Sequence, residues 1–347
     1  MNILITGVGG LVGSEAALYF GKQGHKIIGI DDDTRSHLFG PGASIAPRIE
    51  QLKEALGLNF RWYSWSICDD EINDVFATFR PEVVIHTAAQ PSHDWAAKNP
   101  MFDFHTNANG TLNVLEAARM YVPNSPFIFT STNKVYGNTP NSLPLYEAET
   151  RLELRSHPFT DGITEEMSID HSLHSIFGVS KTAADLMVQE YGRYFGMPTV
   201  AFRCGCITGP AHRGVELHGF LSYLMKCTAS GKPYTVYGYN GKQVRDNIHA
   251  FDLVRAFDAF IKEPQAGAVY NLGGGFENSC SVLEAIRQCE FITGKKLNWT
   301  YDDNARVGDH KWWITSNTSF QWDYPRWGIT KGLDQILREI YEETSNG

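Results

Sequence analysis

A glycine-rich stretch near the start of the chain constrains the fold more strongly than any other sequence feature. Residues 7–13 read Gly-Val-Gly-Gly-Leu-Val-Gly, directly after an apolar run at residues 3–5 and before a helical pattern. Gly7, Gly10 and Gly13 permit a tight turn, close approach of the backbone to a pyrophosphate, and close packing of helix on strand. The N-terminus of the helix offers free N–H groups to phosphate oxygens. The pattern therefore predicts a dinucleotide-binding unit.

Short apolar runs alternate with helical patterns through the N-terminal part of the chain. The runs lie at residues 3–5, 25–30, 83–85, 127–129 and 200–202. Apolar runs too short for helices, separated by helices, are typical of parallel strands covered on both faces. We therefore predict an α/β fold, a Rossmann-type doubly wound parallel sheet, with a smaller C-terminal substrate-binding region.

After about residue 203 the alternation of apolar runs and helical patterns ends, and loops rich in Gly, Pro and His follow. Substrate-binding insertions are often built on such loops. We expect residues 1–202 and about 236–270 to form the dinucleotide-binding domain, and about 203–235 and 271–347 the substrate region. The final helical pattern, which we expect to pack against the core, carries an apolar stripe of Leu333, Ile336, Leu337, Ile340 and Tyr341.

Composition excludes several classes of function. The formal net charge of -9, from 39 acidic and 30 basic residues, argues against binding to nucleic acid or anionic membranes. No run of apolar residues is long enough to span a membrane. The strand pattern begins at the first residues and leaves no room for a signal peptide. We therefore expect a cytoplasmic protein with neither nucleic-acid nor membrane partners.

The cysteines are too sparse for a disulfide scaffold. Six occur in 347 residues, and Cys204 and Cys206 lack the spacing and the second pair of a zinc site. Reduced, mostly buried thiols are the expected state. We predict no metal site.

An acidic residue follows the second apolar run. Asp31 can accept hydrogen bonds from both ribose hydroxyls and would repel a 2′-phosphate, which favours NAD over NADP. Arg35 is close enough in sequence to keep NADP open as an alternative. Asp32 is included among the candidate cofactor contacts, although Asp32 and Asp33 also fit a solvated turn.

Four further motifs accompany the glycine spacing. They are Asn-Ala-Asn-Gly-Thr from residue 107, Ser-Thr-Asn-Lys-Val-Tyr-Gly at 131–137, Ser-Lys-x-Ala-Ala-Asp at 180–185, and Gly-Lys-Gln-Val-Arg-Asp at 241–246. Together they resemble the extended short-chain dehydrogenases/reductases over nearly the whole chain. Within that class the sequence is most similar to the CDP-paratose (CDP-tyvelose) 2-epimerases.

The resemblance implies a reaction and a set of cofactor contacts. The family oxidises a sugar hydroxyl to a ketone with tightly held NAD, presents the other face of the keto sugar, and returns the hydride. Thr132 would bind the reacting sugar oxygen and Lys181 the nicotinamide ribose. Ser66 stands where the family usually has an acidic residue for the adenine. The implied cofactor contacts are Gly7, Gly10, Leu11, Val12, Gly13, Asp31, Asp32, Ser66, Ile67, Ala88, Ala89, Gln90, Asn107, Thr130 and Lys181.

The resemblance also implies a nucleotide-sugar substrate and a homodimer. Arg245 and Arg306 match the family's two arginines for the diphosphate, and a guanidinium suits phosphate oxygens. A surface ion pair is the alternative for either arginine. Asn133 and Lys134 replace the Asp-Glu pair of a related dehydratase family, which disfavours dehydration. The implied substrate contacts are Thr132, Asn133, His93, His218, Arg245, Arg306 and Asp309.

One position departs from the family. Phe177 stands one helical turn before Lys181, where the family has its catalytic tyrosine. Phenylalanine has no proton to exchange, and acid–base catalysis typically contributes ~10²–10⁴ in rate. Three explanations remain open: another acid–base group, a substitution that traps a bound ligand, or a protein that binds NAD and a nucleotide sugar without turnover. A different oxidoreductase on the same ligand class is a further alternative. Candidate replacement groups are His171, His174, His93, Asp94 and Tyr136.

Overall fold

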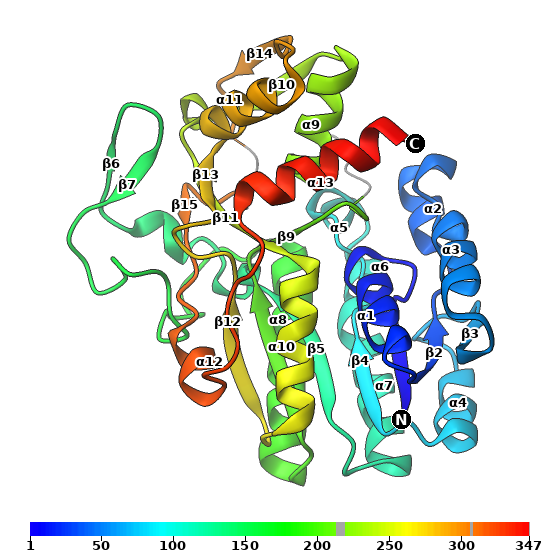
Figure 1. The fold of residues 1–347 in the computed structure, drawn as a ribbon. Coiled ribbons are helices and arrows are strands. Elements are labelled where there is room, and N and C mark those ends of the chain that lie inside the picture. The colour runs from blue at the N-terminus through cyan, green and yellow to red at the C-terminus, as the bar shows by residue number, and fades with distance from the viewer. Residues whose placement is uncertain (213–218, 306–307, 347) are drawn as a thin grey trace. The chain divides into compact units, whose positions relative to one another are not determined.

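A computed structural model describes residues 1–212, 219–305 and 308–346 (Figure 1). The chain divides into two compact units. The first unit comprises Met1–Val135, Ile176–Arg203 and Val254–Tyr270, and the second comprises Tyr136–Ser175, Cys204–Leu253 and Asn271–Gly347.

The first unit is built on a parallel sheet, which confirms the predicted fold class. Within the described residues the sheet has seven strands in the order β12-β8-β5-β4-β1-β2-β3. β1 pairs with β2 on one side and with β4 on the other. The strand order therefore reverses at β1, as it does in doubly wound nucleotide-binding sheets. The strands are β1 (Asn2–Thr6), β2 (Lys26–Ile30), β3 (Phe60–Tyr63), β4 (Val83–His86), β5 (Phe127–Thr132), β8 (Thr199–Cys204) and β12 (Ala268–Leu272).

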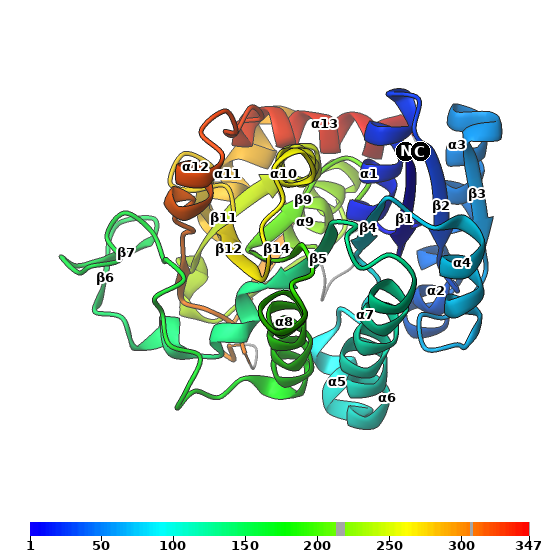
Figure 2. The ribbon, with the colours of Figure 1, turned by 90° about the horizontal axis from the view of Figure 1, so that it is seen from below.

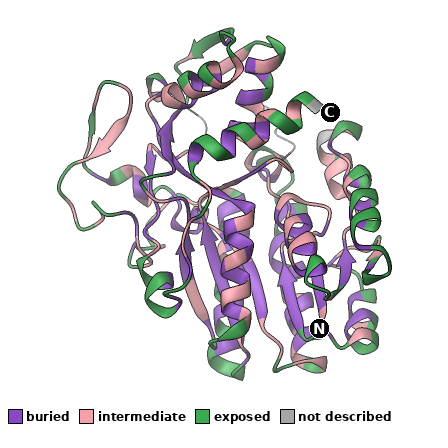
Figure 3. Cartoon of the chain, viewed as in Figure 1, coloured by how far each residue is buried: buried purple, intermediate pink, exposed green. Residues whose placement is uncertain are grey.

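Helices cover both faces of this sheet. α1 and α10 lie on one face, and α7 and α8 lie on the other (Figure 2). The inner strands β1, β4, β5 and β8 are largely buried (Figure 3), which explains their continuous apolar sequences, whereas Arg61 of the edge strand β3 is exposed. The helices are α1 (Leu11–Lys22), α2 (Thr34–Phe39), α3 (Ala46–Leu56), α4 (Glu71–Phe79), α5 (His93–Lys98), α6 (Pro100–Phe104), α7 (Gly110–Tyr121), α8 (Ser175–Phe195) and α10 (Ala250–Lys262).

The second unit contains smaller sheets and a helical layer. β11 pairs with β9, β13 and β15, β10 pairs with β14, and β6 pairs with β7. The apolar stripe of the last helix packs in one core with α9 and α11, as predicted. The elements are β6 (Leu145–Glu147), β7 (Leu152–Leu154), β9 (Cys206–Thr208), α9 (Phe220–Ser230), β10 (Tyr234–Tyr237), β11 (Val244–His249), β13 (Ser279–Ser281), α11 (Val282–Thr293), β14 (Trp299–Asp302), β15 (Trp312–Trp313), α12 (Thr318–Asp323) and α13 (Leu333–Asn346).

The unit boundaries differ from the predicted domain boundaries in two segments. Residues 136–175 and 236–253 belong to the second unit, whereas the sequence analysis assigned them to the dinucleotide-binding domain. The physical reason for the second segment is strand pairing, since β11 hydrogen-bonds to β9, β13 and β15 rather than joining the seven-stranded sheet. Among the described residues, no helix combines the length and the apolar character needed to cross a membrane.

Candidate functional site

The glycine loop forms the turn between β1 and α1. Gly7 has a positive φ of 69°. A Cβ atom on Gly13 would lie 2.2 Å from the Gly7 carbonyl oxygen, and one on Gly7 would lie 2.7 Å from the Ala88 nitrogen, so neither position accepts a side chain. Gly10 is the N-cap of α1 and offers no side-chain cap. The first turn, from Leu11 and Val12, therefore leaves backbone N–H groups for an anion.

Asp31 lies directly after β2 and faces the glycine loop. Its two carboxylate oxygens accept hydrogen bonds from the Gly9 nitrogen (3.0 Å) and the Asp33 nitrogen (3.1 Å). Burial raises the pKa of Asp31 to about 6. A carboxylate has about four acceptor positions, so two hydrogen bonds leave capacity for ribose hydroxyls. This geometry fits the predicted cofactor role.

The two aspartates that follow Asp31 have different surroundings. Asp32 accepts a hydrogen bond from the Thr34 nitrogen, as in a local turn. Asp33 does not lie in a simple solvated turn, because its carboxylate accepts from the Ser44 hydroxyl (2.6 Å) and the Ile45 nitrogen (3.0 Å). These two hydrogen bonds fix the segment before α3. They join residues more than ten positions apart, so short-range sequence patterns do not reveal them.

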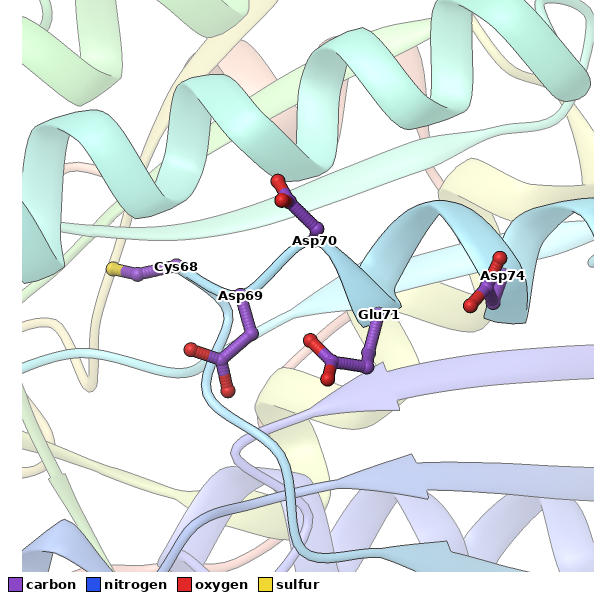
Figure 4. A pocket seen from close by; sticks show the side chains of 5 residues that line it. All are labelled: Cys68, Asp69, Asp70, Glu71 and Asp74. Carbon is purple, nitrogen blue, oxygen red and sulfur yellow. The ribbon is translucent and has the colours of Figure 1, made fainter.

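The segment after β3 contains Ser66 and Ile67, the predicted adenine contacts. The Ser66 nitrogen donates to the Asp69 carboxylate (2.9 Å), and the buried Ile67 offers its carbonyl to Asn113 (2.9 Å). Asp69 places a carboxylate at this segment, which the sequence analysis missed. A surface hollow beside it is lined by Cys68, Asp69, Asp70, Glu71 and Asp74 (Figure 4).

In the part of the chain that the structure describes, no group of three or more His, Cys, Asp or Glu side chains could hold a metal ion. The acidic hollow of Figure 4 therefore lacks the geometry of a metal centre.

Four buried polar side chains form a network after β4. Asn107 exchanges hydrogen bonds with the backbone of Gln90 and donates to Asp103 and Ser180. Ser180 and the Gln90 amide each donate to the Asp103 carboxylate, at 2.6 and 2.7 Å. Asn107 belongs to a π-helix, His105–Asn109, and π-helical turns are frequent at functional sites. Asp103 and Ser180 escaped the sequence analysis, although Ser180 directly precedes Lys181.

His86, the last residue of β4, connects this network to the sheet. Its ring nitrogens lie 2.6 Å from the Thr6 hydroxyl and 2.9 Å from the Thr111 hydroxyl. Thr111 in turn donates to the Asn107 carbonyl (2.7 Å). Burial, assisted by the charge of Lys181, lowers the pKa of His86 to about 3. His86 is therefore neutral at physiological pH and serves the architecture. The predicted cofactor contacts Ala88 and Ala89 follow it, both partly buried.

Lys181 is held against β5. Its Nζ donates to the Thr130 carbonyl (3.0 Å) and lies 4.1 Å from the centre of the Phe129 ring. Thr132 ends the same strand, and its hydroxyl accepts a hydrogen bond from the Lys134 nitrogen (3.3 Å). The lysine and the threonine predicted for the reaction are thus both set by β5. Asn133, the next predicted contact, is buried.

Phe177 lies one helical turn before Lys181 in α8 and is 7% exposed. The ring that packs on it is the imidazole of His93, with ring centres 4.6 Å apart and planes inclined by 53°. His93 is the first residue of α5, whose N-cap Ser92 accepts a hydrogen bond from the Trp95 nitrogen (3.2 Å). The structure thus brings one of the candidate replacement groups to the phenylalanine.

The other candidate replacement groups have different environments. Tyr136 is fully buried, and its hydroxyl donates to the Asn271 side chain at 2.7 Å. His174 hydrogen-bonds the Ser172 carbonyl oxygen through Nδ1 (2.9 Å). Asp94 and His171 are exposed. The Tyr136 hydroxyl therefore has a structural partner in the second unit.

Two of the predicted substrate contacts meet in the second unit. Arg245, in β11, donates to the Asp309 carboxylate (2.6 Å) and to the Val244 carbonyl (2.8 Å), and it is 9% exposed. The sequence analysis gave a surface ion pair as the alternative role of this arginine. Arg245 does form an ion pair, but it is buried, and its partner Asp309 is itself a predicted substrate contact. Arg306 and His218 lie outside the described residues.

The fold and the site together define a class of protein. A parallel sheet whose order reverses at β1, a glycine turn before α1, a carboxylate after β2 and a lysine fixed to β5 are the parts of a dinucleotide-binding oxidoreductase fold. The sequence model of the NAD dependent epimerase/dehydratase family matches residues 3–273. The chain belongs to this family, and NAD is the family's cofactor.

Sequence relatives include both epimerases and dehydratases. The chain is 33% identical over 308 residues to CDP-paratose 2-epimerase of Salmonella typhi, covering 86% of this chain and 87% of the relative. It is 29% identical over 313 residues to dTDP-glucose 4,6-dehydratase of Salmonella typhimurium, covering 82% and 78%.

Solved structures show the same fold. UDP-glucose 4-epimerase of Thermotoga maritima, crystallised with UDP-glucose, superposes with a TM-score of 0.80 at 25% identity, covering 100% of this chain and 99% of that one. UDP-glucuronic acid 4-epimerase of Bacillus cereus, with UDP-glucuronic acid and NAD, gives 0.82 at 24% identity and the same coverage.

Proposed function

We propose that the protein is an NAD-dependent nucleotide-sugar epimerase of the 2-epimerase type, acting on a CDP- or other NDP-hexose through a transient keto sugar. The observation that carries the proposal is the intact lysine site. Lys181 is bonded to the Thr130 carbonyl on the strand that ends at Thr132. The resemblance to CDP-paratose 2-epimerase extends over most of both chains.

The first unit provides the binding site for the cofactor in this proposal. Bound NAD supplies reversible hydride exchange with a sugar carbon. The N-terminus of α1 would hold the pyrophosphate, the Asp31 carboxylate would accept hydrogen bonds from the hydroxyls of the adenosine ribose, and Lys181 would donate to the nicotinamide ribose. Asn107 positions the loop after β4 through its hydrogen bonds to Gln90. The glycine turn fits a pyrophosphate because Cβ atoms at Gly7 and Gly13 would collide with the backbone.

Two residues favour epimerisation over dehydration. Elimination of water needs an acid and a base beside the sugar. Asn133 and Lys134 occupy the positions where the related dehydratases carry Asp and Glu. Asn133 cannot ionise, and Lys134 is cationic. On this basis we propose epimerisation rather than loss of water, although the chain is also 29% identical to dTDP-glucose 4,6-dehydratase.

The second unit provides the groups for the nucleotide part of the substrate. We assign Arg245 and Arg306 to the diphosphate and Asp309 to the nucleotide ribose. His218 is a further proposed substrate contact. A guanidinium has five N–H donors, so pairing with Asp309 leaves donors for phosphate oxygens. The same ion pair would fix the orientation of Arg245 before a ligand binds.

Exposed apolar side chains on the first unit support a homodimer. One face of α8 exposes Ile176, Val179 and Leu186, at 41%, 49% and 41% of their surface. Side chains of this kind on one helix are typical of an interface with a second copy. We propose a cytoplasmic homodimer, and light scattering coupled to gel filtration would measure its mass.

Mass spectrometry of small molecules that copurify with the protein tests the proposed ligands. Stoichiometric NAD together with a nucleotide sugar is the expected result. Assays with CDP-, UDP-, GDP- and dTDP-linked sugars then distinguish the functions. Conversion to an isomer without net NADH supports the epimerase. Net NADH release would identify another oxidoreductase, and tight binding without turnover, which Phe177 would explain, would identify a binding protein.

A further inference from the structure

The site has a lysine and a threonine for the reaction but lacks a proton acceptor at residue 177. Transient oxidation of a sugar hydroxyl releases a proton that a nearby group has to accept. Phe177 is almost completely buried and cannot do so. Among the described residues, the ring in contact with Phe177 is the imidazole of His93. The unprotonated nitrogen of a neutral imidazole can accept a proton, and histidine is the side chain that most often serves as a general acid or base.

The position of His93 is fixed by the same network that positions the cofactor loop. The Ser92 nitrogen donates to the Gln90 side chain (2.5 Å), and the Gln90 amide donates back to the Ser92 carbonyl (2.9 Å). Gln90 also hydrogen-bonds Asn107 and Asp103. Ser92 then caps α5, which begins at His93. The residue directly before His93 is therefore hydrogen-bonded to the buried network.

The two imidazoles of this site differ in burial. The His86 ring is fully buried, both of its nitrogens contact hydroxyl groups, and burial lowers its pKa to about 3. His93 is only partly buried. The ring of Phe177 limits the movement of the imidazole on one side, as packing in a specific tilted arrangement does.

We propose that His93 is the general base and acid of the epimerisation, in place of the missing tyrosine, and that Phe177 positions its imidazole. This inference rests on the proposed function. In oxidation the sugar O–H bond would break and an N–H bond would form on His93, while bound NAD would take the hydride from the carbon that carries this hydroxyl. In the return step His93 would give its proton back to the ketone oxygen, and the hydride would add to the carbonyl carbon from the opposite face. The imidazole is then neutral again, and neither electrons nor protons are gained or lost.

Replacement of His93 by an aromatic residue that cannot titrate provides the test. His93→Phe keeps a ring against Phe177 and removes only the acid–base group. We expect kcat for a nucleotide sugar that wild type epimerises to fall ~10²–10⁴-fold, with NAD affinity and melting temperature unchanged. His157→Phe, at a histidine of the second unit, is the matched control and should retain wild-type activity. In His93→Ala, added imidazole should restore part of the turnover.

A second variant separates a catalytic role of His93 from a structural one. His93→Phe combined with Phe177→Tyr returns a proton-exchanging group to the site without a histidine, and we expect it to recover much of the lost kcat. A purely structural role would give neither this recovery nor the imidazole effect. Wild-type kcat in His93→Phe would overturn the proposal and leave the epimerase function standing. Wild type without epimerisation of any nucleotide sugar, although it binds one, would overturn both.

Discussion

The Ser180 hydroxyl donates a 2.6 Å hydrogen bond to the Asp103 carboxylate, and both side chains are buried. Asp103 lies in α6, directly before the π-helix that contains Asn107, whereas Ser180 directly precedes Lys181 in α8. This bond therefore couples the lysine predicted to hold the nicotinamide ribose to the loop predicted to contact the same cofactor. Ser180 therefore has a positioning role in the site without taking part in the reaction.

Ser180→Ala should destabilise the protein and weaken NAD binding. The substitution removes the donor to one oxygen of the buried Asp103 carboxylate, and a buried acceptor left without a hydrogen bond costs about 1–3 kcal/mol. Thermal unfolding and NAD titration measure the two effects. Ser230→Ala is the control, since the Ser230 hydroxyl bonds the Lys226 carbonyl at an exposed helix end. Equal effects of the two substitutions would contradict the role given to Ser180.

Gly13→Ala should abolish measurable NAD binding. The added Cβ would lie 2.2 Å from the Gly7 carbonyl oxygen, so α1 would have to move away from the turn that receives the pyrophosphate. Gly42→Ala is the control, because nothing lies within 4 Å of a Cβ at that position. Calorimetric titration of both variants with NAD provides the comparison. Wild-type affinity in Gly13→Ala would exclude this turn as the phosphate site.

NAD affinity should decrease as pH falls through about 6. Burial raises the pKa of Asp31 to about 6, so the ionised carboxylate is present above this pH and is lost below it. Protonation removes an acceptor for the ribose hydroxyls and the repulsion of a 2′-phosphate. The preference for NAD over NADP should therefore narrow between pH 7 and pH 5, and Asp31→Ala should remove the pH dependence. A preference that is constant over this range would contradict the assignment of Asp31.

Arg245→Ala should weaken binding of the nucleotide sugar and leave NAD binding unchanged. Hydrogen bonds to charged groups contribute about 1.5–3 kcal/mol, which corresponds to roughly 10-fold or more in affinity. Calorimetry with a CDP-sugar measures the change, and Arg61→Ala, in β3 of the first unit, is the control. If Arg245 serves only to pair with Asp309, the variant will bind the nucleotide sugar as wild type does.

Local patterns predicted the fold class and the glycine turn because both depend on residues adjacent in the sequence. Hydrogen bonds between residues far apart in the sequence could not be predicted in this way. Asp103 and Ser180 are 77 positions apart, and Arg245 and Asp309 are 64 apart, so neither hydrogen bond could be read from spacing. The compact units differ from the predicted domains at residues 136–175 and 236–253, and for the second segment the reason is that the strand partners of β11 are set by tertiary packing. The roles of the site residues stay predictions.

The central claim is that the protein inverts a sugar carbon by removing and returning the same hydride. Incubation with a CDP-hexose carrying deuterium at C2, followed by NMR and mass spectrometry, measures this directly. The account predicts an epimer of unchanged mass that keeps the deuterium at C2, with no accumulation of NADH. Loss of water, exchange of the label with solvent, or stoichiometric NADH release would contradict it.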